Sequence, residues 1–117
     1  MKMPGPIEIS VRELASQVEL SVDGIWRARS SAAISYPAES NQLLYEVEDQ
    51  SFWFSHRNRC LVEVLRRYPP NGVLLDIGGG NGCVSSAIQA SGWPVVLMEP
   101  GPAGARNARA RGIEHVI

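Results

Sequence analysis

The residues best suited to chemistry in this 117-residue chain form the glycine-rich run DIGGGNG over residues 76–82. The run follows a short apolar stretch and opens a segment of helical pattern. Glycines at such a turn let the backbone bend tightly and approach a ligand without a side chain in the way. The first N–H groups of the following helix, at its positive dipole end, would face the same ligand. The run therefore predicts a ligand-binding loop.

Two well-known glycine motifs fit this run poorly. The dinucleotide fingerprint G-x-G-x-x-G/A, started at Gly78, places its third position on Cys83, which is neither glycine nor alanine. Starts at Gly79 or Gly80 also fail. A degenerate dinucleotide site stays open as an alternative. The phosphate-binding P-loop is excluded, because it ends in Gly-Lys-Ser/Thr and no lysine follows Lys2.

A third pattern fits: apolar-apolar-Asp-x-Gly-x-Gly-x-Gly over residues 74–82. It resembles motif I of the Rossmann-like (class I) S-adenosylmethionine-dependent methyltransferases. In that family a second acidic residue ends the next strand, and here Glu99 stands 17 residues after Gly82, behind the apolar residues 95–98. A carboxylate at that place can accept both ribose hydroxyls.

The segment before the glycine run adds to the likeness. The sequence FWFSHRNR at residues 52–59, followed by an apolar stretch and by Pro69 and Pro70, is similar to the helix that precedes motif I in a broad bacterial group of these enzymes. The resemblance covers residues 50–117, and residues 1–50 match no motif. We therefore expect an N-terminal extension over residues 1–50 and the N-terminal half of a cofactor-binding domain over residues 51–117.

The resemblance implies S-adenosylmethionine as the cofactor and assigns it these residues: Asp76, Gly78, Gly80, Gly82, Glu99 and Arg57. Asp76 would lie near the amino group of the methionine part, and Glu99 would bind the ribose hydroxyls. Arg57 or His56 would reach the methionine carboxylate, although a solvated helix face is the simpler interpretation of both. Met98 or Pro100 would border the adenine.

The implied reaction is methyl transfer to an unknown acceptor. An in-line displacement at an activated carbon needs mainly positioning, so no metal is expected. The family's acceptor pocket comes from segments that would lie beyond Ile117, so no catalytic residue is assigned. Two alternatives remain: a non-catalytic module that binds a nucleoside cofactor or assembles with a partner chain, and an NAD-dependent oxidoreductase, which Cys83 disfavours.

The elements around the run predict an α/β fold. Apolar runs at residues 73–77 and 94–99 indicate buried strands, helices are expected over 83–90 and 103–111, and a third strand begins at Glu114. Strands alternating with helices favour a parallel sheet. With the resemblance, we expect a partial three-layer Rossmann-like sheet of about three strands.

In the family's strand order, the strand at residues 73–77 lies in the middle of the sheet, beside a strand that this chain does not supply. We therefore expect an open sheet edge with unpaired backbone groups. Such an edge predicts a homo-oligomer in which a second copy covers it.

The N-terminal half is expected to be helix and loop. Ser10 and Glu13 fit a capping box, which predicts a helix that stops before Asp23. As an alternative, residues 18–22 alternate between apolar and polar side chains, as in a strand. Residues 29–42 are expected to form a loop.

A longer helix is predicted from Ser51 onward. Apolar side chains recur at helical spacing from Phe54 to Tyr68, and Pro69 ends the pattern. Phe52, Trp53 and Phe54 are expected to pack in the core or in a lid. Near the C-terminus, the arginines at positions 106, 109 and 111 are expected on a solvated helix face.

The composition of the chain argues against several other classes of function. The net charge of −1 weakens the case for nucleic-acid binding, which needs an electropositive surface. Cys60 and Cys83 sit in no CxxC pattern, so a zinc site is not expected, and buried thiols are favoured over a disulfide. The N-terminus has no signal-peptide core, and no window approaches the ~20 apolar residues of a membrane span. These features predict a cytoplasmic protein without membrane contact.

Overall fold

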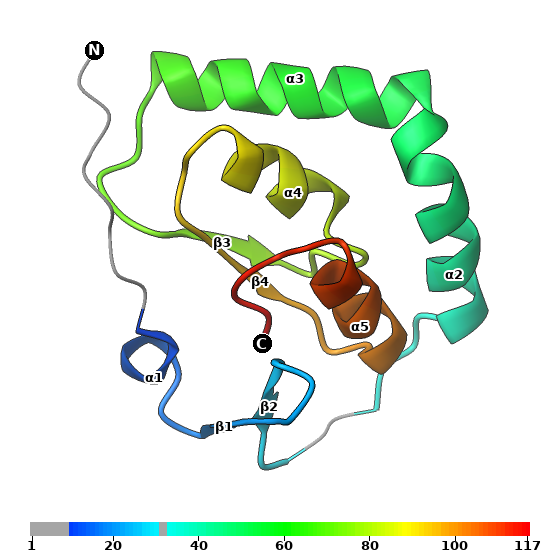
Figure 1. The fold of residues 1–117 in the computed structure, drawn as a ribbon, viewed down its shortest axis with the longest axis vertical. Helices are drawn as coiled ribbons and strands as arrows, with labels where there is room; N and C mark the ends of the chain where they lie inside the picture. The colour runs from blue at the N-terminus through cyan, green and yellow to red at the C-terminus, as the bar shows by residue number, and fades with distance from the viewer. Residues whose placement is uncertain (1–9, 31–32) are drawn as a thin grey trace.

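The computed structural model describes residues 10–30 and 33–117 (Figure 1). Its second half alternates strands and helices along the chain: β3 (Leu74–Ile77), α4 (Cys83–Ala90), β4 (Val95–Met98) and α5 (Pro102–Ala110). β3 and β4 are parallel neighbours, with Leu74 opposite Val95 and Ile77 opposite Met98. The predicted order of strands and helices is confirmed up to α5. α4 has the expected bounds, and those of β3, β4 and α5 differ from the expected ones by no more than one residue at either end.

The expected third strand is only a single bridging residue. Val116 forms isolated parallel bridges to Leu97 on one side and to Ile25 on the other. The N–H of Leu97 donates to the carbonyl of His115 at 2.9 Å, and the N–H of Ile117 donates to the carbonyl of Leu97 at 2.8 Å. The N–H of Glu99 also donates to the carbonyl of Ile117 at 2.8 Å, so the last residues continue the sheet beyond β4. The third strand that was expected to begin at Glu114 is therefore present only as this short bridged segment.

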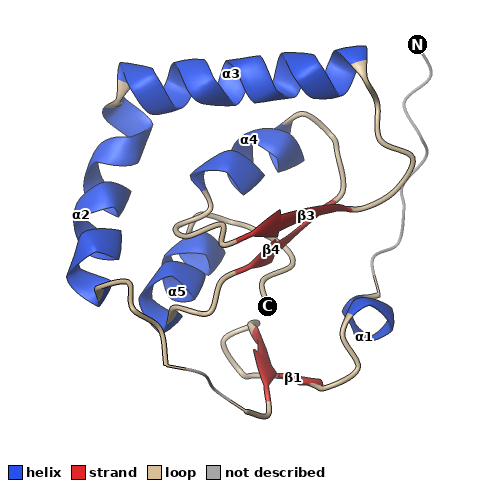
Figure 2. Ribbon diagram, turned by 180° about the vertical axis from the view of Figure 1, so that it is seen from behind, coloured by secondary structure: helices blue, strands red, loops and turns tan. Residues whose placement is uncertain are grey.

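The β3–β4 pair has one covered face and one bare face at β3. Successive strand residues point to opposite faces. Leu74 packs against a cluster containing Ile88 of α4, whereas Leu75 and Ile77 are 47% and 77% exposed. Figure 2 shows the strands from behind. Because no helix of the described residues covers Leu75 and Ile77, the three-layer arrangement is not confirmed.

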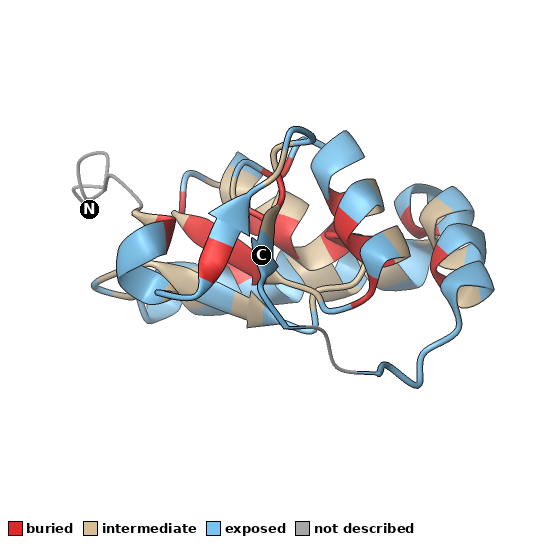
Figure 3. Cartoon of the chain, turned by 90° about the horizontal axis from the view of Figure 1, so that it is seen from below, coloured by how far each residue is buried: buried red, intermediate tan, exposed pale blue. Residues whose placement is uncertain are grey.

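The main core lies between β4, α5, residue Ile25 of the N-terminal extension and the last residues of the chain. It consists of Ile25, Leu97, Ala105, Ala108, Ile113 and Val116. The small alanine side chains of α5 let that helix lie close to the sheet. In Figure 3 the buried residues run through the middle of the molecule, with exposed residues along the outer helices.

The N-terminal extension is less helical than expected. α1 (Val11–Leu14) has only four residues, and the Ser10 side chain makes no capping hydrogen bond. β1 (Val18–Leu20) and β2 (Trp26–Ala28) then form an antiparallel hairpin. The preferred helix is therefore right only over Val11–Leu14. From Val18 onward the strand alternative is right, because this segment finds backbone partners in β2.

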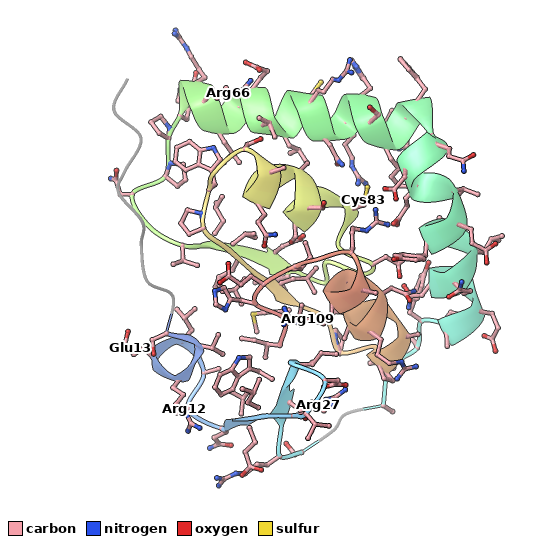
Figure 4. The ribbon with its side chains drawn as sticks, viewed as in Figure 1. Arg12, Glu13, Arg27, Arg66, Cys83 and Arg109 are labelled. Carbon is pink, nitrogen blue, oxygen red and sulfur yellow. The ribbon has the colours of Figure 1, made fainter. Side chains whose placement is uncertain are left out.

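The hairpin is joined to the C-terminal end of the chain. The N–H of Trp26 donates to the carbonyl of Val116 at 2.8 Å. At the turn, Arg27 donates hydrogen bonds to Asp23 and thereby lowers the pKa of that carboxyl from its ordinary 3.8 to about 2. Arg109 of α5 lies toward this turn (Figure 4), and a Cβ at Gly24 would come within 2.7 Å of its Nε.

Two helices frame the rest of the molecule. α2 (Ala38–Val47) passes through the short 3₁₀ helix η1 (Glu48–Gln50) into α3 (Phe52–Arg67), and the two long helices meet at a corner in Figure 1. α3 is confirmed as predicted. The expected loop over residues 29–42 ends earlier, since α2 begins at Ala38.

Several side chains differ from expectation. Phe52 and Trp53 are exposed and do not pack in the core. Cys83 is buried as expected, but Cys60 is exposed, and both thiols are free. Within the part of the chain that the structure describes, no helix combines the length and apolar character needed to cross a membrane.

Candidate functional site

The glycine run forms a loop whose backbone faces open space at two positions. Gly78 and Gly80 have φ values of +73° and +55°, a left-handed conformation that glycine adopts without strain. A Cβ at Gly78 would meet no atom within 4 Å, and a Cβ at Gly80 would reach only Asn41 Oδ1, at 4.0 Å. A ligand can therefore approach this backbone closely, as the sequence predicted.

Gly82 also has a positive φ, +81°, but it serves packing. A Cβ there would lie 3.0 Å from Ile113 Cγ1 and 3.1 Å from Ala108 Cβ. The loop is thus pressed against α5 at this point. Gly82 precedes α4 as predicted, yet it does not line the pocket described below.

Glu99 stands at the carboxyl end of β4 and holds the loop. Its Oε2 accepts a hydrogen bond from the N–H of Gly80 at 2.8 Å, and its Oε1 accepts one from the N–H of Gly101 at 2.7 Å. Each carboxylate oxygen has two lone pairs, so each retains one acceptor position. The carboxylate is therefore fixed in orientation and still able to bind a pair of hydroxyl groups.

Asp76 belongs to β3, the strand next to Glu99's strand. Its Oδ2 accepts a hydrogen bond of 2.6 Å from the hydroxyl of Ser85, in the first turn of α4. This bond leaves the other carboxylate oxygen available. Parallel strands bring their carboxyl ends to the same edge of a sheet, which is why Asp76 and Glu99 both reach the glycine loop.

Arg57 of α3 lines the same pocket as the glycine loop. Its guanidinium lies over the ring of Phe54, 5.0 Å from the ring centroid, and its Nη2 donates to Asn58 Oδ1 at 3.3 Å. Its Nε is buried and has no hydrogen-bond partner within residues 10–30 and 33–117. A buried donor without a partner costs about 1–3 kcal/mol. This donor suits an anionic ligand group.

His56 is placed differently. It is exposed, stacks on Phe52 with ring centroids 5.6 Å apart, and does not line the pocket. The solvated-face interpretation is therefore right for His56 and wrong for Arg57.

Arg57, Asp76, Gly78, Gly80 and Glu99 line one pocket of about 500 Å³, a size typical of small-molecule sites. Five of the six predicted cofactor residues meet there, all but Gly82. Pro100 also lines it, whereas Met98 does not. One wall comes from the N-terminal extension, which sequence reasoning did not connect with the site; it consists of Tyr36, Asn41, Leu44 and Glu48.

A cluster behind the pocket was also missed. Arg111 Nη2 and Glu48 Oε2 form an ion pair of 2.8 Å, and both side chains are only 8% exposed. Arg111 Nε donates to the carbonyl of Asn81, in the glycine loop, at 3.0 Å. The expected solvated face is therefore wrong for Arg111. Its partner lies 63 residues away in the chain, so no local pattern could have revealed the pair.

Cys83 stands where the dinucleotide fingerprint would have its third glycine or alanine. It points toward α3 (Figure 4), where Asn58 Nδ2 donates to its carbonyl at 3.0 Å and lies 3.3 Å from its sulfur. A second cavity, of about 710 Å³, lies on that side between α3 and α4 and contains none of the glycines. Among the described residues, no group of three or more His, Cys, Asp or Glu side chains could hold a metal ion.

Comparison with known proteins gives a similarity among the solved structures. No protein-family model matches the chain, and no curated protein matches it. A crystal structure of a SAM-dependent methyltransferase from Bacteroides fragilis, in complex with S-adenosyl-L-homocysteine, is similar at 29% identity and a TM-score of 0.41. The match covers 47% of this chain and 23% of that one. A TM-score this low does not by itself establish a common fold.

Proposed function

We propose that the pocket at the glycine loop binds S-adenosylmethionine and that this chain supplies the cofactor-binding half of a methyltransferase. The observation that carries the proposal is the position of Glu99. Its carboxylate faces the exposed glycine backbone, fixed by two N–H groups, with one acceptor position free on each oxygen. This arrangement matches the two vicinal hydroxyls of a ribose.

Two further side chains that line the pocket suit an amino acid. Arg57 offers a buried, unpaired donor to a carboxylate, and Asp76 offers a carboxylate to an ammonium group. Two opposite charges fit the zwitterionic methionine part of the cofactor. A dinucleotide would instead bring a pyrophosphate to the loop, where Asp76 would repel it. This difference favours a methyltransferase function over that of an NAD-dependent enzyme.

In this proposal the described residues bind and orient. S-adenosylmethionine supplies a methyl group already activated on its sulfonium. Glu99 sets the ribose, Arg57 and Asp76 set the methionine part, and the glycine backbone permits close approach. Because in-line displacement depends mainly on alignment, such positioning is the contribution we assign to this chain. The acceptor is unassigned.

A second candidate is a non-catalytic module that binds the same cofactor and assembles with a partner chain. The bare side of β3 favours it, since Leu75 and Ile77 expose apolar surface that a partner could cover. Methyl transfer from S-adenosylmethionine to any acceptor would exclude this candidate.

Calorimetric titration of S-adenosylhomocysteine into the chain tests the proposal, with NAD as the comparison ligand. We expect saturable binding of S-adenosylhomocysteine and weak or no binding of NAD. Glu99→Ala should weaken binding about 10- to 100-fold, because a hydrogen bond to a charged group is worth ~1.5–3 kcal/mol. Glu114→Ala, at an exposed acid outside the pocket, is the matched control. Equal binding by the Glu99 variant and the wild type would overturn the proposal.

A further inference from the structure

The helix that forms one wall of the pocket has little apolar anchorage. In α2, only Asn41 is buried. Leu43 and Val47 are 65% and 44% exposed. Most helical stability in proteins comes from burying an apolar face, so α2 has to be held in place by other contacts. Elements with few buried apolar contacts also open at low free-energy cost.

Polar contacts supply that anchorage. Asn81 of the glycine loop donates from Nδ2 to the carbonyl of Asn41 at 2.7 Å and accepts at Oδ1 from Asn107 Nδ2 at 3.0 Å. Arg111, directly after α5, binds both the Asn81 carbonyl and Glu48. Its guanidinium also lies over the ring of Tyr45, 4.9 Å from the centroid. We call Asn81, Arg111 and Glu48 the latch.

The latch connects the α2 wall of the pocket with the ligand-binding loop. Asn81 directly follows Gly80, whose N–H is bound by Glu99. Asn41 and Glu48 line the pocket themselves. Arg111 pairs with the buried Glu48 and also with the exposed Asp49. Removing Arg111 therefore leaves the buried carboxylate of Glu48 without its charge partner, and the structure can relieve this by moving residues 38–50 into solvent.

We propose that Glu48 and Arg111 are positioning residues that hold residues 38–50 closed over the cofactor pocket. This inference rests on the proposed cofactor site and adds how that site is closed. Neither residue is assigned a contact with the cofactor: they act through Asn81 and the position of α2. Ligand in the pocket should in turn favour the closed wall, because a ligand shifts an equilibrium toward the state it binds better.

A double-mutant cycle tests the pair on the whole chain. Titrations with S-adenosylhomocysteine would compare the wild type, Glu48→Gln, Arg111→Met and the double variant. We expect each single variant to bind about tenfold more weakly or worse, and the double variant to be clearly less impaired than the product of the two effects. Glu63→Gln, which breaks the exposed Glu63–Arg66 pair on α3, is the matched control and should bind like the wild type.

Amide hydrogen exchange separates wall opening from unfolding. In Glu48→Gln we expect faster exchange in residues 38–50 and unchanged exchange in β3 and β4. Added S-adenosylhomocysteine should slow exchange of residues 38–50 in the wild type. Wild-type affinity and unchanged exchange in both single variants would overturn the inference and leave the proposed function standing. No binding by the wild type would overturn the proposed function, and this inference with it.

Discussion

At the scale of single residues, the site depends on groups that serve both structure and binding. Glu99 fixes the glycine loop through Gly80 and Gly101 before any ligand is present. A carboxylate already held by two N–H groups loses little freedom on accepting two hydroxyls, so its orientation favours binding. The glycines divide in the same way, since Gly78 leaves room for a ligand and Gly82 leaves room for α5.

This division predicts different effects of alanine at the two glycines. Both have positive φ, so each substitution costs about 1–2 kcal/mol of stability from backbone strain. Gly82→Ala should cost clearly more, because its Cβ would lie 3.2 Å from the backbone Cα of Ala108. Urea unfolding measures the difference. Equal loss of stability in the two variants would contradict the packing role of Gly82, and Gly78→Ala should be the one that weakens ligand binding directly.

Among the helices and strands, the sequence pattern predicts correctly those whose own residues determine which face is buried. It fails for those whose structure depends on pairing with a segment far away in the chain. The strand–helix alternation from β3 to α5 was predicted, because each element carries its own periodicity and breakers. The β1–β2 hairpin was not preferred, since its local pattern also fits a helix. Its docking depends on Val116, at the other end of the chain.

The docking of the hairpin predicts a large effect at Ile25. This side chain is buried in the main core with Leu97 and Val116. Ile25→Ala should lower the free energy of unfolding by about 2–5 kcal/mol, because it leaves a cavity in a packed core. Val22→Ala, at a fully exposed residue of the same hairpin, should change it little. Thermal or urea denaturation gives both values, and equal effects would mean that the hairpin is not anchored through Ile25.

At the scale of the whole molecule, the two edges of the β3–β4 sheet differ, because one is covered by further backbone hydrogen bonds and the other, among the described residues, is not. On one side β4 is followed by Val116 and Ile25, which extend the hydrogen bonding. On the other side β3 pairs with β4 alone among the described strands. Unprotected edge strands with apolar side chains readily pair with another chain, and Lys or Pro residues, which usually prevent this, are absent from β3.

We therefore predict self-association through β3. The wild-type chain should form dimers or larger species that dissociate on dilution, and Ile77→Lys should shift it toward monomer by placing a charge beside the edge. Val22→Lys adds the same charge on the hairpin and should leave the association unchanged. Sedimentation velocity or light scattering reads the outcome. A wild-type chain that stays monomeric at crystallographic concentrations would refute the prediction.

The glycine loop, the carboxylates of Asp76 and Glu99 and the strands that carry them can all be predicted from the amino-acid sequence. These follow from short-range rules: glycine's conformational freedom, the strand period, and the common edge at which parallel strands end. Three further features become visible only in the folded chain: Gly82 packs against α5, side chains between residues 36 and 48 form a wall of the pocket, and Arg111 is buried against Glu48. The physical reason is that burial and charge pairing depend on which residues meet in space, and Glu48 and Arg111 lie 63 residues apart in the chain.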